Sequence, residues 1–279
     1  MPIRNLLIQL WSYPVRTPDN VMSAALEIAK MLGSRVTAAI CKVDRQSATR
    51  DLGMLLPDVS AVVAAAEREG ESATGEIEAY LLKANTGQYQ PIDILKFDCP
   101  ADIRPRGLIG LARLSDLIVV PIPPGEASHD LAQDLIFASG RPVLLLPSDV
   151  SSEISLAVVV VAWDGSRVAA RAISDALPLL RFSQTVKLVE ITGDKPLEGS
   201  SSTKALSEKL LTHDVRAEID TVSADGTSAS AALARYCSLH HADLLVMGAY
   251  GHSRTRDFFV GGVTTNFVEN PPLPVLLSH

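Results

Sequence analysis

The chain has 279 residues, of which 47% are hydrophobic and 5% aromatic, and its formal net charge at pH 7 is −7. This length suits two domains of about 100–150 residues each, with enough apolar side chains for two substantial cores. The acidic balance argues against nucleic acid as a partner, because there is no basic surplus to neutralise phosphates.

The segment at 1–11 has no cleavage site of the kind that ends a signal peptide, and no window approaches 18 uninterrupted apolar residues. We therefore expect no membrane partner. The three cysteines, Cys41, Cys99 and Cys237, are scattered and odd in number. They suggest neither a disulfide framework nor a metal cluster, and indicate buried thiols in a reducing cytoplasm.

Short runs rich in Val, Ile and Leu recur along the chain with little alternation, which is typical of strands buried on both faces of a sheet. In the first half they lie at 5–11, 34–41, 91–97, 115–122 and 141–147, and in the second half at 156–163, 184–191, 215–222, 242–249 and 273–279. The runs pair off between the halves, with Trp11 aligned to Trp163. The sequence thus predicts a tandem repeat.

Between these runs lie segments with apolar residues at helical spacing, such as 19–32 and 166–180. Asp19 and Ser166 are the expected N-caps, and Gly33 is the expected C-cap of the first segment. Strands that alternate with helices form right-handed βαβ units around a parallel sheet. The sequence predicts an α/β fold of two tandem doubly wound domains, each with a five-stranded parallel sheet, at 1–147 and 155–279 with a linker at 148–154.

The two halves differ in two places. The first half carries extra chain at 46–86, which we expect to form a long or broken helical insertion. The second half has the longer segment before its last strand, at 248–272 against 121–140. Its glycines Gly248, Gly251, Gly261 and Gly262 follow the fourth strand, and "VTTNFVEN" after them is a plausible helical turn.

Ligands of open parallel sheets bind beyond the carboxyl ends of the strands, where the strand order reverses. Glycines there let backbone N–H groups approach an anion, and the start of a helix adds free donors. Thr264 and Thr265 offer hydroxyls. The loop predicts a phosphate cradle, although such a loop can also be only a turn.

Asp164 ends the first strand of the second half, and the first half has no acid at the corresponding place. An acid opposite a phosphate cradle suits a contact with ribose or with a base edge. The alternative is that Asp164 caps the helix beginning near Ser166, and the two roles can coexist.

The pattern G-x2-G-x9-G after "DLLVMG", together with "DGS" after the first strand, resembles the universal stress protein family, strongly over 155–279 and more weakly over 1–147. The resemblance implies a Rossmann-like fold of the adenine nucleotide alpha hydrolase-like type. It also implies a cytoplasmic stress-response protein that binds ATP, ADP or AMP, with or without Mg²⁺, in its C-terminal domain.

The resemblance assigns the contacts residue by residue. Asp164 would contact the adenosine part and the backbone near Ile191 would line the adenine pocket. Ribose and phosphates would be held by Gly248, Gly251, Gly261, Gly262, Val263 and Thr264. Gly262 departs from the family, which usually has Ser or Thr there; this removes a hydroxyl donor but keeps the N–H.

Two alternatives remain at this stage. The chain could be a scaffold that binds no nucleotide, since the resemblance implies that such domains pair along their last strands, here within one chain and with a possible homodimer. It could also be an adenylating enzyme, but "WDGSR" lacks the paired glycines such enzymes need. No base or nucleophile stands out, so any ATP hydrolysis is expected to be slow.

Overall fold

The computed structural model describes residues 2–43, 60–85, 91–99, 106–123, 126–193, 203–250 and 262–279. Strands and helices alternate along both halves, as the buried runs predict. In the first half they are β1 (Asn5–Trp11), α1 (Asp19–Leu32), β2 (Arg35–Val43), α3 (Ser60–Ala84), β3 (Ile92–Cys99), α4 (Arg106–Leu114), β4 (Leu117–Ile122), α5 (Glu126–Ala138) and β5 (Val143–Pro147).

The second half repeats this order of elements. They are β6 (Val158–Ala162), α6 (Arg167–Leu180), β7 (Thr185–Thr192), α7 (Thr203–Leu211), β8 (Ala217–Ser223), α8 (Ala229–Leu239), β9 (Leu244–Gly248), α9 (Gly262–Glu269) and β10 (Val275–Ser278). The predicted α/β class is confirmed.

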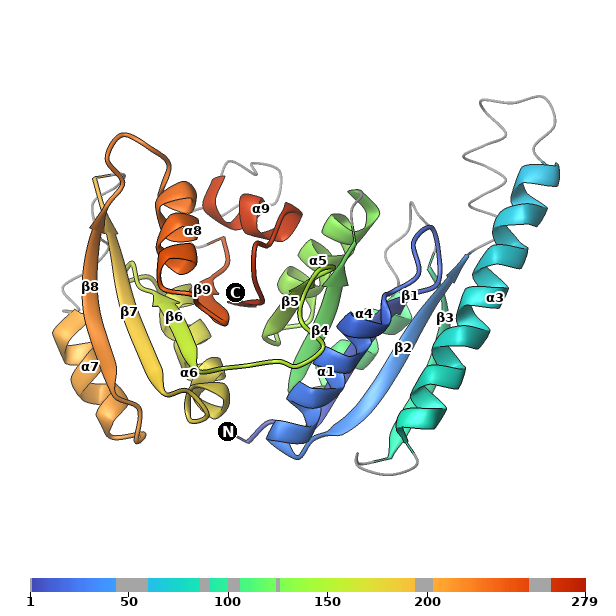
Figure 1. The fold of residues 1–279 in the computed structure, drawn as a ribbon, viewed down its shortest axis with the longest axis horizontal. Coiled ribbons are helices and arrows are strands. Elements are labelled where there is room, and N and C mark those ends of the chain that lie inside the picture. The colour runs from blue at the N-terminus through green and yellow to red at the C-terminus, as the bar shows by residue number, and fades with distance from the viewer. Residues whose placement is uncertain are drawn as a thin grey trace.

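The ten strands form one sheet in the order β3-β2-β1-β4-β5-β10-β9-β6-β7-β8. Neighbours within each half are parallel, whereas β5 and β10 pair antiparallel, with Val275 opposite Leu145. The two halves therefore lie side by side with their last strands in contact (Figure 1). In each half the strand order reverses beside the first strand.

Helices cover both faces of this sheet, and two apolar clusters lie between the helices and the strands. One cluster joins the strands to α1, α3, α6 and α7, and the other joins them to α4, α5, α8 and α9. The central strands β1, β4, β5, β9 and β10 are almost entirely buried, which accounts for their unbroken apolar runs. The strands β3 and β8 lie at the two edges of the sheet.

Two of the three predicted helix caps are confirmed. Gly33 adopts a left-handed φ of 63° after α1, and the Ser166 side chain accepts the Ala169 N–H at the start of α6. The prediction for Asp19 is wrong, because Pro18 occupies the N-cap position and Asp19 is the first helical residue. Its carboxylate pairs with Arg16 instead.

Helix α3 has 25 residues and lies in the segment where the first half carries extra chain, whereas α7 in the second half has 9. The described part of the insertion is therefore one long helix. No helix of the described segments is long and apolar enough to span a bilayer.

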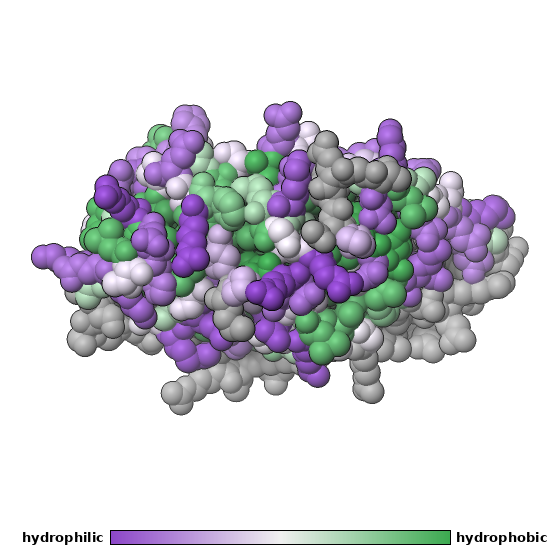
Figure 2. Space-filling view, turned by 90° about the horizontal axis from the view of Figure 1, so that it is seen from below, coloured by the Kyte–Doolittle hydropathy of each residue, from purple (hydrophilic) through white to green (hydrophobic). Residues whose placement is uncertain are grey.

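The C-terminal ends of several helices carry exposed leucines. They are Leu82, Leu114, Leu211 and Leu239. Figure 2 views the molecule from below and shows hydrophobic side chains among hydrophilic ones on that face.

Candidate functional site

The predicted site lies at the carboxyl ends of β6 and β9, which are parallel neighbours in the sheet. Their register places Val161 opposite Val246. Asp164 follows β6 and Gly248 ends β9, so both reach the same edge of the sheet at the reversal of strand order. This is the position at which open α/β sheets bind ligands.

The turn after β6 is organised by Asp164. Its Oδ1 accepts the backbone N–H of Ser166 at 2.9 Å, and Gly165 between them has a φ of 78°, which favours glycine. Ser166 caps α6. The alternative in which Asp164 itself is the N-cap is therefore wrong, and its half-buried carboxylate instead holds the turn that precedes the helix.

Gly248 is needed for close packing. A Cβ at this position would lie 2.6 Å from the Ala169 nitrogen and 2.7 Å from the Val168 carbonyl carbon. The end of β9 thus approaches the first turn of α6 so closely that only glycine fits. This reason differs from the anion approach that the sequence suggested, yet the same packing brings the N-terminus of α6 to the predicted site.

The helix α9 begins at Gly262, which is exposed, and a Cβ there would meet nothing within 4 Å. Val263 is half-buried. Thr264 is buried, and its Oγ1 accepts the Tyr250 N–H at 3.2 Å. This bond ties the start of α9 to the residues that follow β9. The Thr264 hydroxyl thus has a structural role as the acceptor of the Tyr250 N–H, in addition to any contact with a ligand. The sequence pattern does not indicate this role.

Ile191 lies near the carboxyl end of β7, opposite Val222 of β8, and is half-buried. Since β7 is the parallel neighbour of β6, Ile191 also reaches this edge of the sheet. The structure therefore brings Asp164, Ile191, Gly248 and the start of α9 to one edge. Gly251 and Gly261 lie outside the described residues.

An aspartate at the start of the fourth strand fixes which positions of the two halves are equivalent. Asp116 donates its N–H to the Asn5 carbonyl and accepts the Asn5 N–H, at 2.8 and 2.9 Å. Asp243 makes the same two bonds with Val158, both at 2.8 Å. Asn5 is therefore equivalent to Val158, and Trp11 to Asp164.

The sequence alignment of Trp11 with Trp163 is thus wrong by one residue. The two indoles lie in different apolar clusters, on opposite faces of the sheet. Trp11 is 8% exposed, and its Nε1–H donates to the Pro121 carbonyl at 3.4 Å. The aspartates also make Pro121 the equivalent of Gly248. In the first half, a buried indole stands where the second half has its half-buried acid.

One of the three cysteines differs from the prediction that all of them are thiols. Cys41 is disulfide-bonded, so the prediction that the chain holds only thiols is wrong there. Cys237 is a free buried cysteine, and burial raises the pKa of its thiol to about 12. Among the described residues, no group of three His, Cys, Asp or Glu side chains is placed to hold a metal ion.

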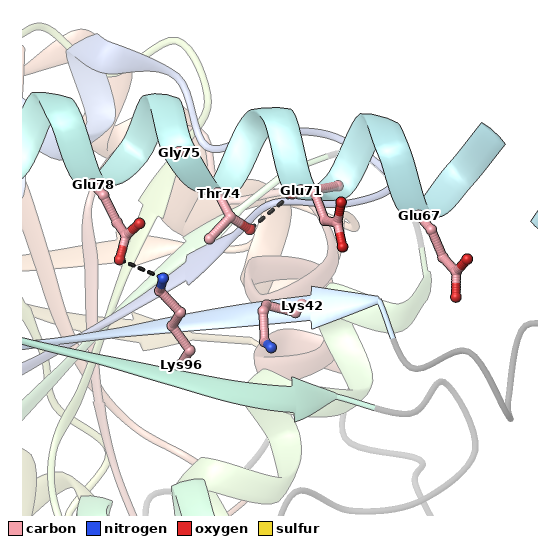
Figure 3. Close-up of a pocket in the computed structure, with 8 residues that line it drawn as sticks. Lys42, Glu67, Glu71, Thr74, Gly75, Glu78 and Lys96 are labelled. Atoms are coloured by element: carbon pink, nitrogen blue, oxygen red, sulfur yellow. Dashed lines mark hydrogen bonds and ion pairs between the residues drawn. The ribbon is translucent and has the colours of Figure 1, made fainter. Parts of the chain in front are cut away.

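A polar pocket of about 310 Å³ lies between α3 and the strands β2 and β3 (Figure 3). It is lined by Lys42, Glu67, Gly70, Glu71, Thr74, Gly75, Glu78 and Lys96. Lys96 pairs with Glu78 at 2.6 Å, and the Thr74 hydroxyl donates to the Gly70 carbonyl. The sequence predicts a helical insertion here and gives no prediction of the pocket. The signal that could have indicated it is the spacing of Glu67, Glu71 and Glu78 along one helix face.

The second half of the chain matches a known protein family. Residues 157–279 match the universal stress protein family. This universal stress protein half runs from the start of β6 to the C-terminus and contains every residue of the predicted site. None of the curated proteins matches the chain in sequence.

Solved structures extend the likeness in fold to the whole chain. A universal stress protein from Archaeoglobus fulgidus matches with a TM-score of 0.68 and 16% identity, over 98% of this chain and 95% of that one. A candidate universal stress protein from Pseudomonas aeruginosa matches with a TM-score of 0.59 and 15% identity, over 99% and 93%. These matches cover both halves, so the likeness in fold extends to the first half.

Proposed function

We propose that the chain is a stress-response or regulatory protein that binds one adenine nucleotide in its universal stress protein half. The proposal keeps the division into domains at 1–147 and 155–279, joined by the linker at 148–154. The cytoplasmic location is proposed from the family resemblance and not from the cysteines, because Cys41 is disulfide-bonded. ATP, ADP and AMP are the candidate ligands, with Mg²⁺ as a companion of the phosphates.

The observation that carries the proposal is the meeting of three features at one edge of the sheet. The Asp164 turn and Gly248 end neighbouring strands, and the tie from Tyr250 to Thr264 brings the N-terminus of α9 beside the end of β9. The first N–H groups of an α-helix have no partner within the helix, so the start of α9 can donate to phosphate oxygens. The acid at the end of β6 suits a ribose hydroxyl.

The first half supports the restriction to one nucleotide. Trp11 fills the position of Asp164, and Pro121 has no N–H to offer where Gly248 has one. We therefore assign no adenine nucleotide to the first half.

Calorimetric titration of the purified chain with ATP, ADP and AMP, each with and without Mg²⁺, tests the proposal. We expect saturable binding of at least one of them. No heat of binding for any of the three at millimolar concentration would rule the proposal out.

A scaffold role is the second candidate, and the continuous ten-stranded sheet favours it. The ladder between β5 and β10 joins the two halves in one sheet, and the strands β3 and β8 lie at the two edges of that sheet. In this role the chain pairs its halves internally and associates further into a homodimer. If a variant that has lost nucleotide binding still supports stress survival in cells, scaffolding is favoured over nucleotide sensing.

A further inference from the structure

We propose that Phe137, on α5 of the first half, is a positioning residue for the nucleotide site of the second half. It acts through Tyr250, the second residue after β9. The consequence for nucleotide affinity rests on the proposed function. The effect on the backbone at Ala249 and Tyr250 does not.

The contact crosses the boundary between the halves. Because β5 and β10 are paired, α5 and α9 lie next to each other on one face of the sheet (Figure 1). The Phe137 ring stacks on the Tyr250 ring with centroids 4.7 Å apart and 30° between the ring planes. The Phe137 and His279 rings also form a T-shaped contact, with centroids 4.9 Å apart.

Tyr250 has a backbone conformation that needs such support. Its φ is 55°, in the left-handed region that residues with a bulky side chain rarely adopt. Its side chain is 4% exposed. A residue in this conformation persists where surrounding contacts hold it, and the aromatic stack with Phe137 is one such contact.

The backbone around Tyr250 is bonded to the other parts of the site. The Tyr250 N–H donates to Thr264 Oγ1 at 3.2 Å, and the Ala249 N–H donates to the Ser278 carbonyl at 2.8 Å. The Ala249 carbonyl lies 3.0 Å from His279 Nδ1. Tyr250 therefore links the end of β9 to the start of α9, and Phe137 is its aromatic contact from the first half.

Loss of the Phe137 ring would free Tyr250 to relax towards a more common backbone conformation. Its N–H would then turn away from Thr264, and the first turn of α9 would lose its fixed position relative to β9. The donors of that turn are the ones proposed to hold phosphate. An aromatic pair of this kind contributes enough that nucleotide affinity should fall about three- to tenfold.

The test compares Phe137→Ala and Phe137→Leu with Phe137→Tyr and with Phe97→Ala. The Leu variant keeps an apolar side chain but removes the stack, and the Tyr variant keeps the ring. Phe97 is a matched control, because it is a partly buried phenylalanine of the first half on β3, at the far edge of the sheet.

Two measurements are made on each full-length protein. Hydrogen exchange of the 244–250 segment without nucleotide reports the backbone tie directly, and calorimetry with ATP reports affinity. We expect faster exchange and about three- to tenfold weaker binding for the Ala and Leu variants, with both properties near wild type for Phe137→Tyr and Phe97→Ala.

Unchanged exchange in both Phe137→Ala and Phe137→Leu would overturn the positioning role. Equal loss in Phe97→Ala would also overturn it, since the effect would then follow general destabilisation. If the wild-type protein binds no adenine nucleotide, the proposed function fails, and the exchange measurement still decides the role of Phe137.

Discussion

Trp11 occupies in the first half the strand position that Asp164 occupies in the second. The equivalence follows from Asp116 and Asp243, which make the same pair of backbone bonds at the start of the fourth strand of each half. Trp11 is buried and bonded to the Pro121 carbonyl, whereas Asp164 is half-buried and holds a turn. The two halves share one fold, but at this position the first half has an indole and the second half has a carboxylate. We therefore assign nucleotide binding to the second half.

Asp164→Asn should weaken adenine nucleotide binding about tenfold, because it removes the charge and replaces the second carboxylate oxygen, an acceptor that suits ribose hydroxyls, with an NH2 donor. The amide oxygen of Asn can still accept the Ser166 N–H, so the turn and the stability should be kept. Calorimetry measures the dissociation constant. Asp93→Asn, at an exposed position of the edge strand β3, is the matched control. Equal affinities for Asp164→Asn and wild type would contradict the assigned contact.

Gly248→Ala should destabilise the protein by about 1–3 kcal/mol, because its Cβ would meet the backbone of Val168 and Ala169. Gly262→Ala should leave the free energy of unfolding unchanged or raise it by up to about 1 kcal/mol, because the space around it is open. Chemical denaturation measures both. A Gly248→Ala variant as stable as wild type would show that β9 and α6 do not approach so closely.

The fold was predictable because buried strands leave continuous apolar runs, and the alternation of these runs with helical segments fixes the α/β class. The alignment of the two halves is not predictable to the residue. The sequence favours matching Trp11 with Trp163, whereas the face of the sheet on which each residue lies depends on strand pairing. The close packing around Gly248 is not predictable from the sequence either, because it involves Val168 and Ala169, which are far away in the chain. Cys41 looked like an isolated thiol for the same reason.

Gly262→Ser should tighten nucleotide binding about fivefold, since it supplies the hydroxyl that the family resemblance leads us to expect at this position, worth about 1 kcal/mol for one hydrogen bond. Nothing within 4 Å obstructs a side chain at this position. Gly110→Ser, at an exposed and unobstructed position of α4, controls for the general effect of a new serine in a helix. Calorimetry with ATP measures both variants. An affinity no higher than wild type would mean that the missing hydroxyl does not face a phosphate.

Tyr250→Phe should reduce the loss of stability at high pH. Burial raises the pKa of Tyr250 from its ordinary value of 10.0 to about 12, so the folded protein holds the phenolic proton more tightly than the unfolded chain. The stability from this difference is complete below about pH 10 and is lost as the pH rises towards 12, by up to about 2–3 kcal/mol.

Urea unfolding of wild type and Tyr250→Phe at a series of pH values from about 9 to 11 measures this effect. The free energy of unfolding of the variant should fall less steeply. Cys237 titrates in the same range but is present in both proteins, so its contribution cancels. Parallel curves would mean that Tyr250 is not shielded from solvent.

The stoichiometry of adenine nucleotide binding tests the central claim most directly. Calorimetric titration of the full-length chain should give one nucleotide per chain, and Asp164→Asn should weaken that single site. Two nucleotides per chain, or saturable binding that Asp164→Asn leaves unchanged, would contradict a site confined to the half that carries Asp164.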